Sequence, residues 1–245
     1  MSSRATSLSF TSPHSNPLHA ARGIYRVLLV DSHPLIGEGL RGLLSGHKDL
    51  QYGGQAHNER HALEVIRRLP PDVVILDLTL SSGSGLDLIK RLQGDAHKLR
   101  TLVYSSHDEV VYAERCLHAG AMGYLSKNED PAKLIDAIRC VIAGYLSISP
   151  ELQNRLIGAA IDRRDHANES PVECLTDREL DVLDLTGHGQ PPREIADKLN
   201  ISVKTVQSHR EHIKEKLHLK SSGELNIYAA EWILEDDAQH HSQSP

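Results

Sequence analysis

The sequence predicts an α/β domain built on a doubly wound, parallel, five-stranded sheet, followed by a small all-α domain. Between residues 26 and 145, short apolar runs alternate with segments of helical spacing, which is typical of a parallel sheet with helices on both faces. Two of the apolar runs end in an aspartate, Asp31 and Asp77. From residue 175 onward this alternation stops, and four short helices fit the pattern instead.

Each element of the first domain has its own local signal. Apolar residues recur at helical spacing in the helical segments, and Pro131 and Gly144 mark the start and the end of the last helix. The second strand has the weakest pattern of the five. The predicted strands are residues 26–30, 50–53, 72–77, 101–105 and 123–127. The predicted helices between and after them are 33–44, 59–69, 85–92, 110–119 and 131–143.

Composition narrows the class of protein. The chain has 245 residues, of which 39% are hydrophobic and 24% charged, as in a soluble globular protein of one large or two ordinary domains. No stretch approaches the roughly 18 apolar residues of a membrane helix, so a membrane-spanning protein is excluded. Cys116, Cys140 and Cys174 lie far apart and follow no disulfide or zinc pattern, which favours the cytoplasm. The net charge of −6 means that any contact with nucleic acid needs a local basic patch.

Polar segments set the expected domain boundaries. The start of the chain is rich in Ser, Thr, Pro and His, and the end is acidic and polar, so both are expected to be disordered. A polar stretch that ends at Pro171 predicts a linker, with a helix at 151–161 before it. The expected units are a tail (1–23), the α/β domain (24–146), a partly helical linker (147–171), the helical domain (172–235) and a second tail (236–245).

Four polar residues follow or end strands of the predicted sheet: Asp31, Asp77, Ser105 and Lys127. The carboxyl ends of parallel strands meet at one edge, where open α/β sheets bind their ligands. Two carboxylates there would repel each other unless a cation lay between them, and oxygen ligands suit Mg²⁺. An aspartate in this setting can attack a phosphoryl group. The alternative is a purely structural ion pair between Asp77 and Lys127.

The helical domain opens with a capping pattern, Leu175-Thr-Asp-Arg-Glu179. Its predicted helices are 177–187, 192–199, 203–217 and 222–234. Residues 172–235 carry eight basic and twelve acidic side chains, but residues 202–220 alone have a net charge of +3. Positive charge on the longer of two helices joined by a tight turn favours insertion into a DNA major groove. The alternative is a solvated helix face.

Residues 26–145 resemble the receiver domain of two-component response regulators. The resemblance rests on Val30-Asp-Ser-His-Pro34, Leu76-Asp-Leu78, Ser105-Ser106 and Gly123-Tyr-Leu-Ser-Lys127. It implies a flavodoxin-like fold in which Asp77 accepts a phosphoryl group. It also implies a Mg²⁺ site made by Asp31, Asp77 and the backbone carbonyl of Thr79, and a phosphoryl switch made by Ser105, Lys127 and Tyr124.

Two positions depart from the receiver pattern. Ser32 stands where the family usually has a second acid that ligates Mg²⁺, so we expect weaker binding of the cation or none. Ser81 stands where the family usually has proline, which favours a more mobile loop. An atypical receiver, regulated by a partner, a ligand or its expression level instead of phosphorylation, is therefore an open alternative.

Residues 172–235 resemble the LuxR-type helix-turn-helix. The match is carried by Leu175–Glu179, Arg193-Glu-Ile-Ala196, Ile201-Ser-Val-Lys-Thr-Val206, His209 and Lys216-Leu-His-Leu219. It implies that 203–217 is the recognition helix. We expect His209 to pack this helix against the domain, and a DNA contact is the alternative. The residues implied to face bases are Gln207, Ser208 and Glu211. Those implied to contact phosphates or the groove are Lys204, Thr205, Arg210 and Lys216. The last helix resembles a dimerisation helix, in which a dimer seam or the domain core is lined by Leu225, Tyr228, Ala229 and Trp232.

Together the two resemblances indicate a response regulator of the NarL/FixJ type. They imply a cytoplasmic transcription regulator that is not an enzyme, binds double-stranded DNA as a homodimer and receives its signal from a sensor histidine kinase. Three other classes compete with this interpretation. A small-molecule sensor needs a large apolar cavity, a phosphatase needs a general acid that the sequence lacks, and a protein-interaction regulator would show no salt-dependent affinity for DNA.

Overall fold

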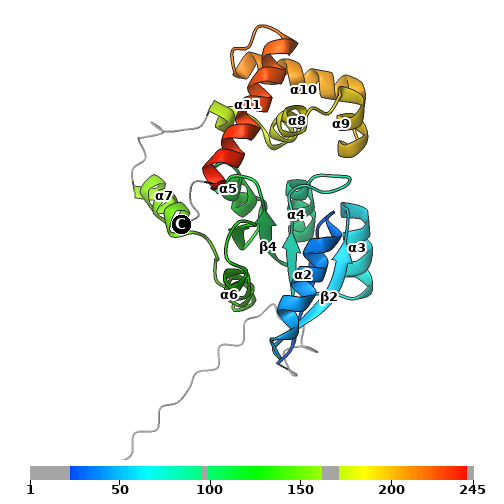
Figure 1. Ribbon diagram of the computed structural model, residues 1–245, viewed down its shortest axis with the longest axis vertical. Coiled ribbons are helices and arrows are strands. Elements are labelled where there is room, and N and C mark those ends of the chain that lie inside the picture. Colours follow the sequence, from blue (N-terminus) through cyan, green and yellow to red (C-terminus); the bar gives the residue numbers. More distant parts are fainter. Residues whose placement is uncertain (1–22, 95–98, 162–170, 242–245) are drawn as a thin grey trace, which may run out of the picture.

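The computed structural model describes residues 23–94, 99–161 and 171–241. The expectation of a disordered start concerns residues that lie almost entirely outside these ranges. Figure 1 shows an α/β unit in blue to green and a helical unit in yellow to red, placed at one end of the sheet. The two predicted units are therefore present.

The α/β unit contains the predicted parallel five-stranded sheet, in the order β2-β1-β3-β4-β5. Its strands are β1 (Tyr25–Val30), β2 (Leu50–Ala56), β3 (Val73–Leu76), β4 (Arg100–Ser105) and β5 (Gly123–Ser126). The chain runs outward from β1 to β2, returns to β3 and then continues to β5. The strand order thus reverses between β1 and β3, the place where sheets of this kind bind ligands.

Alternate residues of each strand enter cores on opposite faces of the sheet. In β1, Leu28 and Val30 pack with α3, α4 and α5, whereas Val27 and Leu29 pack with α2 and α6. Burial on both faces explains why the strands read as unbroken apolar runs. The helices are α2 (Pro34–Ser45), α3 (Glu59–Arg68), α4 (Gly85–Gly94), α5 (Glu109–Ala119) and α6 (Pro131–Ile142).

The linker contains the predicted helix, α7 (Pro150–Ile161), followed by a short 3₁₀ turn, η1 (Pro171–Cys174). Leu152 of α7 is buried, and the Arg155 guanidinium donates a hydrogen bond of 2.7 Å to the carbonyl of Val110 at the start of α5. The helical part of the linker is therefore packed against the α/β unit.

The helical unit consists of α8 (Asp177–Gly187), α9 (Pro192–Leu199), α10 (Val203–Lys216) and α11 (Ser222–His241). The predicted capping box is present: Thr176 Oγ1 accepts from the Glu179 N–H, and Glu179 Oε2 accepts from the Thr176 N–H. Helix α11 extends to His241, seven residues beyond the predicted end at residue 234. No glycine or proline occurs between Gly223 and Pro245, so nothing in the sequence stops the helix there.

Helices α8 and α11 pack closely at Gly187. A Cβ atom at this position would lie 2.4 Å from the carbonyl oxygen of Ala229. Only glycine allows the two backbones to approach this closely.

The two units are in direct contact (Figure 1). Asp177, at the start of α8, forms ion pairs with Lys90 of α4 at 2.7 Å and with Arg115 of α5 at 3.1 Å. The Gly83 N–H donates to the Lys198 carbonyl at 2.8 Å, and apolar contacts continue from the sheet into the helical unit. Helix α8 and the end of α9 are thus docked on α4, α5 and the loop after β3.

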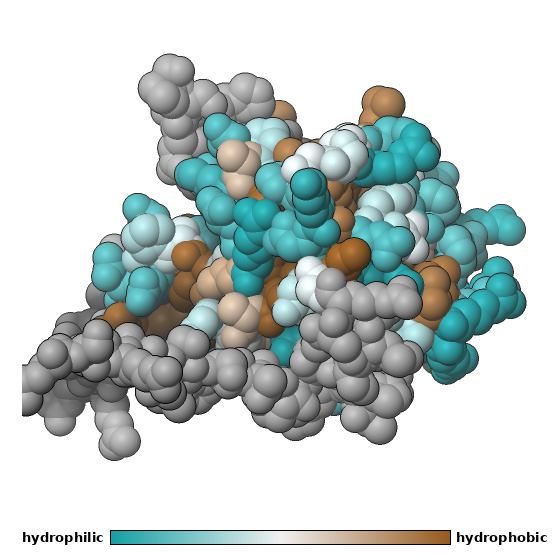
Figure 2. Space-filling view, turned by 90° about the horizontal axis from the view of Figure 1, so that it is seen from below, coloured by the Kyte–Doolittle hydropathy of each residue, from teal (hydrophilic) through white to brown (hydrophobic). Residues whose placement is uncertain are grey.

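Apolar side chains are scattered over the face of the α/β unit farthest from the helical unit. Figure 2 shows brown residues interspersed among teal ones in the visible part of this face, with no single broad apolar patch. None of the helices in the described ranges combines the length and the apolar character that crossing a bilayer requires.

Candidate functional site: an acidic pocket and an exposed helix

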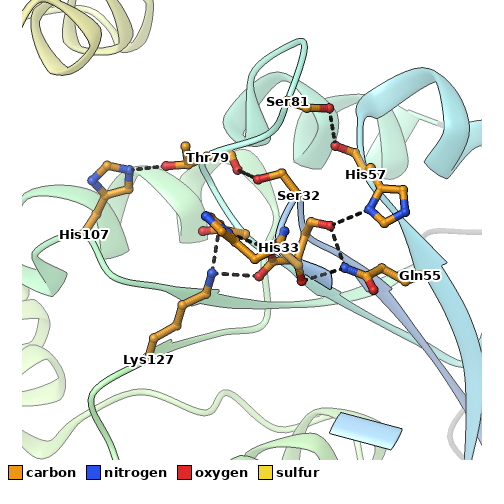
Figure 3. Close-up of polar contacts among 10 residues, drawn as sticks. Ser32, His33, Gln55, His57, Thr79, Ser81, His107 and Lys127 are labelled. Carbon is orange, nitrogen blue, oxygen red and sulfur yellow. Dashed lines mark hydrogen bonds and ion pairs between the residues drawn. The ribbon is translucent and has the colours of Figure 1, made fainter. Parts of the chain in front are cut away.

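The predicted acidic pocket forms at the carboxyl edge of the sheet (Figure 3). Asp31 follows β1, Asp77 follows β3, Ser105 ends β4, and Lys127 follows β5. The Lys127 ammonium lies 2.7 Å from Asp31 Oδ2 and 2.9 Å from Asp77 Oδ2. Both carboxylates and the Ser105 side chain are buried, and Lys127 is partly buried, so residues from four strand ends form one site.

The charges in this pocket stabilise one another. Burial by itself lowers the pKa of Lys127, but the carboxylates of Asp77 and Asp31 outweigh burial and leave the pKa above its usual value. Lys127 is therefore a permanent cation between two acids at neutral pH. The ion pair between Asp77 and Lys127, which the sequence analysis left as an alternative, is therefore present as part of this pocket.

The loops around the pocket supply further oxygen atoms. The Ser32 hydroxyl donates to the Thr79 carbonyl at 3.3 Å, so the residue that replaces the usual acid contacts the carbonyl assigned to Mg²⁺ by resemblance. His33 Nδ1 lies 3.0 Å from Asp31 Oδ1, and its backbone N–H donates to the same oxygen. Two carboxylates and a backbone carbonyl form an oxygen donor set that fits Mg²⁺, with one negative charge fewer than two adjacent acids would supply.

His107, which the sequence analysis did not single out, joins this pocket to the helical unit. Its Nε2 is hydrogen-bonded to Thr79 Oγ1 at 3.0 Å, and its backbone N–H donates to Ser105 Oγ at 3.3 Å. The Tyr124 hydroxyl donates to the His107 carbonyl at 2.7 Å, so the predicted switch tyrosine points inward. His107 Nδ1 lies 3.7 Å from Asp184 Oδ1 of α8. In the sequence, only its position two residues after Ser105 indicates that His107 lies near the pocket.

Helix α10 presents most of the predicted DNA-contacting side chains to solvent. Ser202 caps the helix by accepting from the Thr205 N–H at 3.0 Å, and Val206 and Ile213 anchor it in the core. Thr205 is half-buried, and Lys216 is exposed and donates to Glu179 Oε2 at 2.7 Å. The other exposed members of the predicted set are Lys204, Gln207, Ser208 and Glu211.

Arg210 does not lie on this exposed surface, so the expected phosphate contact is corrected. Only 6% of the residue is exposed. Its guanidinium donates to Thr186 Oγ1 of α8 at 3.0 Å and to Asn226 Oδ1 of α11 at 2.8 Å. Arg210 therefore ties three helices together inside the domain.

The predicted residues of α11 divide into two pairs. Leu225 and Ala229 are fully buried in the core of the helical unit, where they face α8 and are not available to a second chain. Tyr228 and Trp232 are partly buried and pack against the same core. Of the two roles that the sequence left open, core packing describes Leu225 and Ala229.

Comparison with known proteins covers both units. The family model described as response regulator receiver domain matches residues 27–139, and the model described as bacterial regulatory proteins, luxR family, matches residues 173–229. Response regulator GacA of Pseudomonas viridiflava is 34% identical over 204 residues, which are 83% of this chain and 94% of that protein. Nitrate/nitrite response regulator protein NarL of Escherichia coli (strain K12) is 33% identical over 212 residues, 86% of this chain and 95% of that protein. Among solved structures, the Salmonella typhimurium RcsB response regulator aligns with a TM-score of 0.67 and 25% identity, covering 85% of this chain and 98% of that one.

Proposed function

Since the chain belongs to the NarL/FixJ-type response regulators, which are transcription regulators with a receiver domain and a LuxR-type DNA-binding domain, we propose that it is controlled by phosphorylation of Asp77. One observation carries the proposal: the Lys127 ammonium lies 2.7 Å from a carboxylate oxygen of Asp31 and 2.9 Å from one of Asp77, and both carboxylates are buried. The proposed donor is a sensor histidine kinase, and the proposed place of action is the cytoplasm.

The chemistry proposed for Asp77 is a single phosphoryl transfer. A carboxylate oxygen of Asp77 attacks the phosphorus, a new O–P bond forms, and the bond between phosphorus and the donor breaks with its electron pair leaving on the donor. Lys127 neutralises the transferred oxygens, and the Ser105 hydroxyl donates to one of them. Asp31, Asp77 and the Thr79 carbonyl are the residues that would hold Mg²⁺, whose chemistry is to neutralise charge on the transferred group.

His107 provides a route from the pocket to the reading domain. Its ring contacts Thr79 on one side and approaches Asp184 of α8 on the other. A rearrangement of Ser105 and Thr79 around a phosphoryl group would change both contacts. We therefore propose that phosphorylation alters how α8 docks on the receiver domain.

The proposed output is binding of paired DNA half-sites by a homodimer. Gln207, Ser208 and Glu211 are the proposed base contacts, and Lys204, Thr205 and Lys216 the proposed phosphate or groove contacts. Glutamine suits adenine, and glutamate suits the amino group of cytosine. Tyr228 and Trp232, which are only partly buried, are the remaining candidates on α11 for a dimer seam.

One experiment tests the phosphorylation step. The full chain is incubated with acetyl phosphate, with and without Mg²⁺, and intact mass is measured after short times. One phosphoryl group is expected on the wild type and none on Asp77→Asn. Failure of the wild type together with success of Ser32→Asp would support the atypical receiver instead.

A second experiment tests the output. In-vitro site selection from random duplexes, performed with wild type and Asp77→Asn, identifies the preferred half-site and its spacing. The affinity for that site is then measured at several salt concentrations. A steep salt dependence supports direct DNA binding, whereas the absence of any salt-dependent affinity would favour a protein-interaction regulator.

A further inference from the structure

Three side chains with metal-ligating atoms lie together in the DNA-binding domain, away from the acidic pocket. Glu179 comes from the first turn of α8, and His209 and His212 lie one turn apart on α10. One ligand atom of each side chain lies within 4.8 Å of the others. Phosphorylation of the receiver domain and base contacts by α10 make no use of this cluster.

The two oxygens of Glu179 have different surroundings. Oε2 accepts from the Thr176 N–H at 2.8 Å and from the Lys216 ammonium at 2.7 Å. Oε1 lies 3.7 Å from His212 Nδ1. Burial raises the pKa of Glu179, but these hydrogen bonds outweigh it and hold the pKa below its usual value, so the carboxylate is ionised. One oxygen is thus committed to the capping box and Lys216, while the other lies near His212.

Both imidazoles offer a ring nitrogen to the cluster, and His209 is partly buried. Metal ions bind the neutral form of histidine. About half of the His212 side chain is exposed, so an ion can reach the cluster from solvent. Ligand atoms around a tetrahedral zinc ion stand roughly 3.4 Å apart, as follows from bonds of about 2.0–2.1 Å. The distance of 3.7 Å between Oε1 and Nδ1 is close to that value.

We propose that Glu179, His209 and His212 bind a divalent transition-metal ion of the Zn²⁺ class. Two imidazoles and one carboxylate are the ligands of open zinc sites, with water in the remaining position, and nitrogen ligands exclude Mg²⁺ and Ca²⁺ as the preferred ions. The ion joins the start of α8 to the recognition helix. Since Asp177 in the same turn of α8 docks on the receiver domain, the metal fixes the reading helix to the segment that carries the interdomain ion pairs.

The neighbouring ammonium sets the strength of this site. Lys216 lies 2.7 Å from the other oxygen of the same carboxylate and repels a cation. We therefore expect weaker binding than in a closed site with four protein ligands. Binding to the folded state alone raises the stability of the domain in proportion to the logarithm of the metal concentration.

The test uses the full chain, freed of metal by a chelator and then titrated with Co²⁺ and with Zn²⁺. Co²⁺ reports tetrahedral nitrogen and oxygen ligation by its visible absorption, and calorimetry gives the stoichiometry and affinity of Zn²⁺. Because the chain has 16 histidines, the informative quantity is the difference between wild type and variants. His212→Gln removes an exposed ligand, so the variant is expected to fold, and His209→Gln removes the half-buried one.

The matched control is His218→Asn, which removes an exposed histidine just beyond α10 at a position with a φ of 56° that asparagine tolerates. We expect His212→Gln to weaken binding by about tenfold or more and to abolish the rise in Tm with Zn²⁺, while His218→Asn binds as the wild type does. Wild-type affinity, Co²⁺ spectrum and Tm response in His212→Gln would overturn the proposal, and so would an equal loss in His218→Asn.

Discussion

Replacement of Arg210 by alanine separates a structural role from a DNA contact. Its guanidinium makes two hydrogen bonds, to Thr186 at 3.0 Å and to Asn226 at 2.8 Å, and the residue is 6% exposed. A hydrogen bond to a charged group contributes about 1.5–3 kcal/mol, and removal of the buried charge returns part of that sum. We expect Arg210→Ala to lower the free energy of unfolding of the DNA-binding domain by roughly 2–3 kcal/mol.

Urea denaturation followed by tryptophan fluorescence measures this loss, because the single tryptophan of the chain, Trp232, lies in α11. At a slope of about 1–2 kcal/mol per molar urea, the midpoint should fall by at least about 1 M. The control is Lys204→Ala on the exposed face of the same helix. Lys204→Ala should change the free energy of unfolding by less than about 0.5 kcal/mol. It should lower the affinity for DNA and reduce the slope of log affinity against log salt concentration by about one. Unchanged stability of Arg210→Ala together with a reduced salt slope would refute the structural assignment.

Three further predictions follow from other contacts. Lys127→Ala should lower the stability of the receiver domain by about 3–5 kcal/mol, because it leaves two buried carboxylates without their cation. In thermal melts, excess Mg²⁺ should restore part of the loss. A variant that melts at the wild-type temperature without Mg²⁺ would contradict this. Burial raises the pKa of Asp181, at the docked face of α8, from 3.8 to about 7. The docked form therefore holds its proton more tightly than the separated form, and docking should weaken as the pH rises from about 4 to about 7. Small-angle scattering at about pH 4.5 and about pH 7.5 measures this weakening, and Asp181→Asn should abolish the difference. Gly187→Ala should destabilise the DNA-binding domain by about 1–3 kcal/mol, since the new Cβ would lie 2.4 Å from the Ala229 carbonyl oxygen; chemical denaturation showing no loss would argue against that close contact.

The sheet and the acidic pocket were predictable because their signals are local. A buried parallel strand reads as an apolar run, and its first polar residue marks the carboxyl end, which places Asp31 and Asp77 at one edge without any knowledge of distant contacts. Strand β2 was predicted too short, since Gly53 and Gly54 weaken its pattern. Its extension to Ala56 comes from pairing with β1, where Val30 lies opposite Ala56.

The residues that were missed or misassigned depend on partners far away in the chain. Arg210 has the charge and helical position of a phosphate contact, but its partners Thr186 and Asn226 come from two other helices. His107 approaches Asp184, 77 positions later in the sequence. Periodicity records which face of a helix is apolar, not which polar group lies opposite, so neither contact could be predicted.

The position of His107 between the two domains has a consequence for the order of events at a promoter. Coupling between two binding sites is reciprocal. If modification of the acidic pocket releases the reading domain by a given factor, capture of that domain by its operator favours the modified pocket by the same factor. Operator DNA is then an effector of the receiver domain, and the phosphorylation equilibrium of a regulator seated on its promoter should lie further toward the phosphorylated form than that of one free in solution.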